Sequence, residues 1–388
     1  MEKRLHKHIP FPRLLTVLVA IFLGLVLFNT TYLDLGTIVP LIVIFFTIGV
    51  VLFKYGIRKV SFNSIIIFVL IAFFSTFVSG GNDYRELVKI LLTVFFFLIV
   101  ISIPYKNEEV KFLSFMLCLL YVIYAILVIQ SIGLDTAVYG RVTIIILGGD
   151  IPLDPNVTAT AFVLPVTICT YNALYGKYRL LAFGEIFVFL VAMMACSSRG
   201  AFLGLLGAVI IVADYVFHNK TSLLTKMVLI IIFVMCIKYA LFDFLKDDSL
   251  FGIERIIDYQ GDDTSNGRTK IWSEKIGLLT SSLYAFLLGY GNNYSLGYTG
   301  HVSHNTILQI FYYGGLLGFI CFFKPIVRLF RRKTINNSIK YALFASVFIP
   351  IFFIDTLEER TLWNFLIFYT ILSSRNNADN YLIWFEKR

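Results

Sequence analysis

Apolar stretches long enough to cross a lipid bilayer recur along almost the whole chain, and they limit its fold more than any other feature. A helix that spans the hydrocarbon core needs about 20 mostly apolar residues. Hydrophobic residues make up 58% of the 388 positions and charged residues only 15%, whereas a soluble domain carries about 25% charged residues. The sequence therefore predicts an all-α polytopic membrane protein that forms a single integral membrane domain over residues 1–388.

About twelve transmembrane spans are predicted, and the basic residues of the short loops set their orientation. The predicted spans are 13–33, 35–53, 61–79, 86–103, 112–133, 157–174, 180–196, 200–217, 227–245, 305–323, 341–356 and 360–373. Most Lys and Arg residues fall inside when both termini are cytoplasmic. Charged residues interrupt the segment 341–373, so a single kinked helix is the alternative to the last two spans.

Three other features exclude common functions. The net charge of +9 does not indicate nucleic-acid binding, because the basic residues are scattered over loops. The five cysteines lie within apolar stretches, so neither a disulfide nor a metal site is predicted. The first apolar stretch resembles a signal peptide but lacks a small-residue cleavage site, and we interpret it as a retained span.

Two outward segments are longer than a turn. The first outer loop is predicted at 134–156 and a large outer loop at 246–304. Within the large loop, apolar residues at helical spacing predict two short amphipathic helices at the membrane surface, one over 253–257 and one carrying Trp272, Ile276, Leu279 and Leu283. The glycine-rich stretch 288–293 predicts a tight turn after the second helix.

Arginine at the predicted outer side is the strongest chemical signal. Arg199 stands between two apolar stretches with almost no loop, where a charge is costly and needs a partner. Its guanidinium stays charged and offers a planar fork that suits phosphate oxygens. The alternative is an anchor that snorkels to the interface. Gly200, Gly204 and Gly207 follow at the spacing of closely packed helices.

Two loop arginines and one histidine are further candidates. Arg141 and Arg268 lie in the outer loops, although a loop arginine is often merely solvated. Ser303 is expected to cap the next helix and to place His304 in its first turn. The positive end of the helix dipole would then favour a neutral imidazole, which can accept a proton from a sugar hydroxyl. A purely structural hydrogen bond is the alternative for His304.

Nothing in the sequence indicates nucleotide or metal chemistry. It contains no Walker A motif, no dinucleotide-binding fingerprint, no His-Glu-x-x-His and no Cys-x-x-Cys pattern. An enzyme of this kind would need a substrate that is already activated and already in the membrane.

A series of short motifs resembles the O-antigen polymerase and ligase superfamily, the Wzy and WaaL proteins. The motifs are Asp154-Pro-Asn156, Ser197-Ser-Arg-Gly-Ala201, Gly267-Arg-Thr-Lys-Ile-Trp272, Leu288-Gly-Tyr-Gly291 with Ser303-His-Asn-Thr306, and Gly314-Gly-Leu-Leu-Gly318. Each motif is short, but their order and placement make the combination specific. Asp154 and Pro155 also fit the N-cap and first position of a helix, and this structural role explains the motif by itself. Only the resemblance therefore suggests that Asn156 belongs to a site.

The resemblance implies an inverting glycosyltransferase of the bacterial inner or plasma membrane that needs no metal or other cofactor. Its donor would be an undecaprenyl-pyrophosphate-linked oligosaccharide, and a chain-length regulator and a flippase are possible partners. The expected catalytic residues are Arg199, Arg268 and His304. The expected substrate-binding residues are Arg141, Asn156, Trp272 and Asn305. In this scheme the arginines bind the diphosphate and the histidine activates or orients the acceptor hydroxyl.

Three functions remain open from the sequence. The Asp154-Pro-Asn156 motif and the Arg141 loop favour a polymerase of O-antigen or capsule type over a ligase, which would transfer finished glycan to the lipid A core. A lipid-linked glycan flippase is the alternative from another class. Transporters tend to show repeated halves and binding groups at the bilayer midplane, whereas the candidate groups here gather at the outer interface.

Overall fold

The computed structural model describes residues 14–25, 49, 63–81, 84–132, 144, 153–196, 198–218, 268–293, 303–354, 357 and 360–384. Every regular element among them is a helix, apart from one antiparallel bridge between Ile144 and Leu153. The first helices are α1 (Leu14–Leu25), α3 (Asn63–Val78), α4 (Arg85–Ser102), α5 (Asn107–Ile132), α6 (Pro155–Ala161), α7 (Val163–Tyr175) and α8 (Arg179–Cys196). The later ones are α9 (Arg199–Gly204), α10 (Leu206–His218), α13 (Arg268–Thr280), α14 (Leu283–Leu288), α15 (Thr306–Phe330), α16 (Asn337–Phe348), η4 (Pro350–Phe352), α17 (Arg360–Ser373) and η5 (Ala378–Tyr381).

The helices correspond closely to the predicted spans. Among the described residues, five helical segments are long and apolar enough to cross a membrane: Asn107–Ile132, Pro155–Tyr175, Arg179–Cys196, Gly200–His218 and Thr306–Phe330. Three shorter apolar helices cover Asn63–Val78, Asn337–Phe352 and Thr361–Ser373. The predicted span 227–245, nearly all of 35–53 and the end of 13–33 lie outside the described residues. The protein is thus an all-helical integral membrane protein.

Two predictions about helix ends need correction or completion. The helix predicted at 305–323 continues to Phe330, because its apolar face carries on past Phe323. Within the segment 341–373, α16 and α17 are separate helices, as predicted, and the alternative of a single kinked helix is wrong. Phe344 of α16 packs its ring on Phe365 and Tyr369 of α17 at 5.2 and 4.9 Å, and Phe348 packs on Phe365 at 5.9 Å. These pairs require the two helices to run antiparallel.

The loops that were predicted to be cytoplasmic meet at one end of the bundle. The C-terminal segment 375–384 covers this end and joins helices that are distant in sequence. Asn172 of α7 donates from Nδ2 to the Leu382 carbonyl at 2.9 Å, and the Asn336 N–H donates to Asp379 at 2.9 Å. Ser338 of α16 donates to the Asp214 carboxylate of α10 at 2.6 Å. The ends of α7, α10 and α17 therefore lie beside the start of α16.

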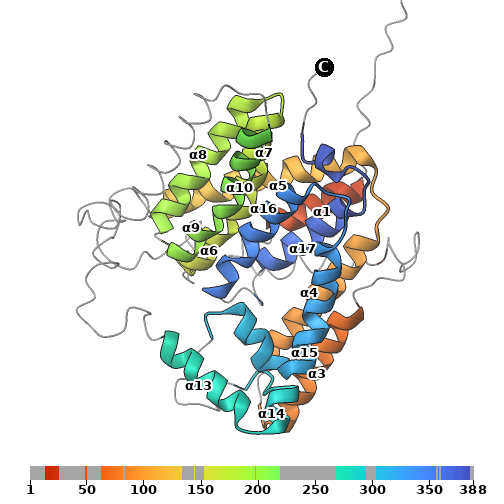
Figure 1. Cartoon of the computed structure of the whole chain (residues 1–388), viewed down its shortest axis with the longest axis vertical. Helices are drawn as coiled ribbons and strands as arrows, with labels where there is room; N and C mark the ends of the chain where they lie inside the picture. The colour runs from red at the N-terminus through yellow and green to blue at the C-terminus, as the bar shows by residue number, and fades with distance from the viewer. Residues whose placement is uncertain are drawn as a thin grey trace, which may run out of the picture.

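Helices α3 and α15 form the lower part of the molecule in Figure 1, where α13 and α14 lie beside their ends. Their close approach depends on glycine. A Cβ on Gly314 or Gly318 would come within 3.2 Å of the Phe68 ring of α3. The small-residue segment 314–318 is thus a packing surface, as expected for membrane helices.

Helix α15 breaks at Gly315, and the break anchors the glycine-rich turn that follows α14. Gly315 has φ +57°, so the carbonyls just before it are released from the helical pattern. The Tyr290 N–H donates to the Tyr312 carbonyl at 2.8 Å, and the Gly291 N–H donates to the Tyr313 carbonyl at 3.2 Å. Gly289 and Gly291 also have positive φ, which confirms the tight turn predicted at 288–293.

The other side of this turn is bonded to α3. The Asn292 N–H donates to the Thr76 hydroxyl at 2.7 Å, and the Ser79 hydroxyl donates to the Tyr290 carbonyl at 2.9 Å. A Cβ on Gly291 would lie 2.1 Å from the Thr76 hydroxyl oxygen. The turn therefore lies between α3 and α15 and is hydrogen-bonded to both. Its position determines where α13 and α14 lie.

We predict that Gly315→Ala destabilises the protein by about 2 kcal/mol or more, because an L side chain at positive φ is strained and its Cβ would lie 2.4 Å from the α14 backbone. Thermal unfolding in detergent measures the loss. Gly277→Ala on α13 is the matched control, because a Cβ there meets nothing within 4 Å. Equal melting temperatures for the two variants would contradict this account of the break.

Candidate active site

Two short helices begin side by side at the end of the bundle opposite to the C-terminal segment. Asp154 caps α6 by accepting the Asn156 N–H at 2.7 Å, with Pro155 in the first turn, as the sequence predicted. Ser198 caps α9 by accepting the Ala201 N–H at 3.5 Å. Because α6 contacts α9, Asn156 and Arg199 both lie in the first turns of neighbouring helices. The side chain of Arg199 lies outside the described part of the structure.

Glycines bring α9 against η4. A Cβ on Gly204 would lie 2.7 Å from Pro350, and a Cβ on Gly200 would lie 3.2 Å from the Phe353 Cβ. Gly207 of α10 is equally close to α16, where a Cβ would lie 2.5 Å from the Ala342 carbonyl oxygen. The predicted close packing of this glycine series is confirmed, and it holds the first residue of α9 beside the segment that follows η4.

That segment in turn holds the start of α15. The backbone N–H and the hydroxyl of Thr306 both donate to the Ile354 carbonyl, at 3.1 and 2.7 Å. The Thr306 side chain is fully buried. The start of α15, next to the predicted catalytic histidine, is therefore connected through Ile354 and η4 to α9, which begins at Arg199.

The cap of α15 differs from the prediction. Asn305 is the N-cap, and its side chain accepts the Leu308 N–H at 3.0 Å. Ser303 instead donates its hydroxyl to the Asn305 carbonyl at 2.9 Å. His304 consequently lies before the helix and not in its first turn. The amide of Asn305 is the better cap here because its oxygen reaches the free N–H groups of the first turn.

His304 adopts a backbone conformation that is uncommon for a residue with a side chain. Its φ is +48°, in the left-handed region, and its side chain is half-buried. Residues other than glycine occur there infrequently, although histidine is enriched among them. Such strained positions cluster at active sites. His304 therefore lies at the point where the chain turns into α15. We call this point the His304 corner.

Helix α13 reaches this corner through Trp272. Its indole N–H donates to the Ser303 carbonyl at 2.7 Å, one residue before His304. Arg268 is the first residue of α13 and is half-buried. Because Arg268 and Trp272 are four residues apart, they lie on the same face of the helix. The structure therefore brings the face that carries Arg268 to the corner that carries His304.

The inward face of α13 differs from the predicted amphipathic face. Ile271, Lys275 and Leu279 are the buried residues, whereas Ile276 is 51% exposed and Leu283 belongs to the separate helix α14 and is 74% exposed. Trp272 and Leu279 of the predicted face are thus turned toward the protein, whereas Ile276 and Leu283 are not. Exposed apolar side chains on a short outer helix suit a position against the bilayer interface. The helix predicted at 253–257 lies outside the described residues.

Lys275 is a residue that the sequence reasoning missed. Its side chain is only 5% exposed, and its Nζ lies 4.2 Å from the centre of the Tyr312 ring of α15. A buried cation over an aromatic ring is stabilised by the ring quadrupole. Lys275 lies seven residues after Arg268, so both cations share one side of α13. The spacing 268, 272 and 275 was the signal that could have identified it.

The predicted site residues thus divide into three groups. Trp272, His304 and Asn305 lie around the start of α15, and Arg268 lies one turn before Trp272 on α13. Asn156 and Arg199 begin the two helices that pack beside η4. Arg141 lies outside the described residues.

A family model for the O-antigen ligases matches residues 185–323 of this chain. This range runs from α8 to the middle of α15 and contains Arg199, Arg268 and His304. Residues 185–323 are therefore similar to this family, which supports the resemblance to the O-antigen polymerase and ligase superfamily. No curated protein matches the chain.

This similarity indicates one class of chemistry. Proteins with this domain are glycosyltransferase-like enzymes that act on lipid-linked oligosaccharides. The domain supports a function of the O-antigen polymerase or ligase type for this chain. Asn156 and the loop of Arg141 lie before the matched range, so the match does not extend to them.

We predict that Trp272→Phe lowers glycan transfer about tenfold, because loss of the indole N–H leaves the Ser303 carbonyl without that donor and loosens α13 at the His304 corner. Transfer by purified protein measures the effect. Trp384→Phe is the matched control, since it removes an indole hydrogen bond to Ser114 at the opposite end of the bundle. An equal loss of transfer in both variants would indicate a general stability effect.

Proposed function

We propose that the protein is a polysaccharide polymerase that works at the outer face of the cell membrane. It transfers glycan from an undecaprenyl-pyrophosphate-linked donor to the hydroxyl of an acceptor sugar. The contact between Trp272 and Ser303 carries this proposal, because it joins the helix that begins at Arg268 to the corner at His304. The family match to O-antigen ligases supports the reaction class.

The proposed reaction is a direct displacement at the anomeric carbon of the donor. The acceptor oxygen forms the new bond to that carbon, and the bond to the diphosphate oxygen breaks with its electron pair. The hydroxyl proton passes to the imidazole of His304, which acts as general base. The configuration at the anomeric carbon is inverted, because the nucleophile enters opposite to the leaving group.

Positive charge is the main requirement of this step. The diphosphate leaves as an anion, so fixed cations can stabilise the charge that develops on it without a general acid. Arg268 and Arg199 are assigned this role, and their guanidinium groups suit bidentate contacts to phosphate oxygens. Helix N-termini add to the positive field, and the first turns of α9 and α15 lie at this end of the bundle.

An O-antigen ligase is the second candidate. The observation that favours it is the description of the matching family. The polymerase is preferred because Asp154-Pro-Asn156, which resembles a polymerase motif, begins α6 directly beside α9. Deletion of the gene separates the two. Surface glycan that carries a lone repeat unit indicates a polymerase, whereas polymer that is not attached to the lipid A core indicates a ligase.

We predict that Arg268→Ala and His304→Ala each reduce polymer formation about 100- to 1,000-fold, because one loses transition-state charge stabilisation and the other loses the proton acceptor. Gel analysis of polymer made by membranes supplied with lipid-linked repeats measures the effect. Protein level in the membrane is followed in parallel.

Arg328→Ala is the matched control for the loss of an arginine. Arg328 lies exposed in the last turn of α15, at the far end of the same helix. Wild-type chain length in both Arg268→Ala and His304→Ala would refute the enzyme assignment. Normal polymer formation together with defective movement of lipid-linked repeats across vesicle membranes would instead indicate a flippase.

A further inference from the structure

Ser303, the residue before His304, is fully buried and is hydrogen-bonded through its N–H, its carbonyl and its hydroxyl. The Trp272 indole donates to the carbonyl at 2.7 Å, and the hydroxyl donates to the Asn305 carbonyl at 2.9 Å. The Ser303 N–H donates to the side-chain oxygen of Gln309 at 3.4 Å. Gln309 belongs to none of the sequence motifs, and this contact places it beside the candidate site.

Gln309 lies near the start of α15, and its side chain is fully buried. Helical side chains lean toward the N-terminus of their helix, so its carboxamide can reach back to Ser303. A buried carboxamide in a membrane helix is costly unless its polar atoms are hydrogen-bonded. The hydrogen bond to Ser303 offsets part of that cost, which an apolar side chain of the same length would not incur.

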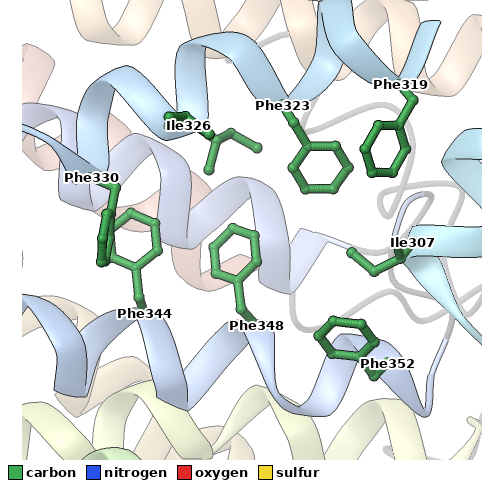
Figure 2. Close-up of a pocket in the computed structure, with 9 residues that line it drawn as sticks. Ile307, Phe319, Phe323, Ile326, Phe330, Phe344, Phe348 and Phe352 are labelled. Carbon is green, nitrogen blue, oxygen red and sulfur yellow. The ribbon is translucent and has the colours of Figure 1, made fainter. Parts of the chain in front are cut away.

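Packing holds the start of α15 only in part. An aromatic groove runs between α15 on one side and α16 and η4 on the other, and it contains a cavity of about 330 Å³. Figure 2 shows Ile307 at one end of this groove, opposite Phe352. The other rings that line it are those of Phe319, Phe323, Phe330, Phe344 and Phe348. Close packing normally holds an element in one position, so hydrogen bonds contribute more to positioning where a cavity borders the first turn.

The hydrogen bonds of Ser303 act on His304 through the backbone. The φ of +48° at His304 is unfavourable for a residue with a side chain, and such a conformation persists only where the surroundings fix it. Gln309 binds the N–H of Ser303 and Trp272 binds its carbonyl, so together they fix the residue that leads into His304. Without the contact to the N–H, this residue could rotate, and the imidazole would move with it.

We propose that Gln309 is a positioning residue for glycan transfer, which holds the His304 imidazole where it meets the acceptor hydroxyl. The inference rests on the proposed function, in which His304 is the general base. Because Gln309 is fully buried, it acts through Ser303 and His304 and not by contact with the substrate. A displacement of the base by about 1 Å can lower the rate of transfer about 100-fold.

Gln309→Met tests the proposal, because methionine keeps the length of the side chain and loses the oxygen. We expect kcat for glycan transfer to fall about 10- to 100-fold and KM for the lipid-linked donor to change less than about twofold, because other residues bind the diphosphate. Gln309→Glu keeps an oxygen that can accept the Ser303 N–H and should retain at least about a third of the wild-type kcat. An equal fall in kcat in the two variants would contradict the proposal.

Asn172→Leu is the matched control for the loss of a buried carboxamide. Asn172 is 3% exposed and binds the C-terminal segment at the opposite end of the bundle. We expect this variant to have a lower melting temperature than the wild type and an unchanged kcat per folded protein. If both Asn172→Leu and Gln309→Met lose kcat in proportion to their loss of melting temperature, the role of Gln309 is only structural and the proposal is wrong.

A double variant tests whether Gln309 acts through His304. Gln309→Met combined with His304→Ala should transfer glycan no more slowly than His304→Ala alone, because residues that act as a unit have non-additive effects. A further loss of kcat in the double variant, equal to that of Gln309→Met alone, would refute the positioning role.

Hydrogen–deuterium exchange in detergent separates failure of this contact from failure of the proposed function. In Gln309→Met, the peptide that contains residues 303–305 should exchange at least about tenfold faster than in the wild type. Unchanged exchange would overturn the positioning role and leave the polymerase assignment intact. Faster exchange together with wild-type transfer by His304→Ala would overturn the proposed function, and with it any catalytic role of the His304 corner, while the contact itself would stand.

Discussion

The break in α15 at Gly315 is the constraint on which the arrangement of α13, α14 and the turn at 288–293 depends. Backbone carbonyls inside a membrane protein must find a donor, and this break releases those of Tyr312 and Tyr313. The turn at 290–291 supplies the donors, and its other side bonds to α3. One local departure from helical geometry therefore fixes the turn, the short helix α14 before it and the end of α13 that adjoins α14. Trp272 can reach Ser303 only because α13 is held there.

The candidate site combines segments that are far apart in the sequence, and each contributes a different physical property. Helices α6 and α9 bring two N-termini together, and glycines let α9 approach η4 closely. The double bond from Thr306 to Ile354 then joins η4 to the start of α15. Helix α13 adds the cations Arg268 and Lys275. Arg268 lies one turn before Trp272, whereas Lys275 lies over the Tyr312 ring, farther along α15.

The sequence predicted short-range interactions better than interactions between residues that are distant in the chain. Helices and their local caps were predictable, as for Asp154 and Pro155, because the residues that decide them are neighbours in the chain. The glycine series at 200, 204 and 207 also indicated close packing correctly. The cap of α15 was assigned to Ser303 in place of Asn305, since two adjacent residues can both cap and only the path of the entering chain selects one. The inward face of α13 was predicted only in part, since Leu279 is buried as expected but Ile276 is exposed and Lys275 is buried.

The sequence by itself determined that this protein is helical and lies in a membrane, and its short motifs identified most of the residues around the candidate site. Those properties follow from hydrophobicity and helical periodicity, which are read within one or two turns. Only the tertiary structure decided that His304 stands before the helix, that Lys275 lies buried over the Tyr312 ring, and that an aromatic groove opens between α15 and α16. Each of these depends on how helices rotate and separate when they pack, and phenylalanines that line a groove have the same local pattern as those that fill a core.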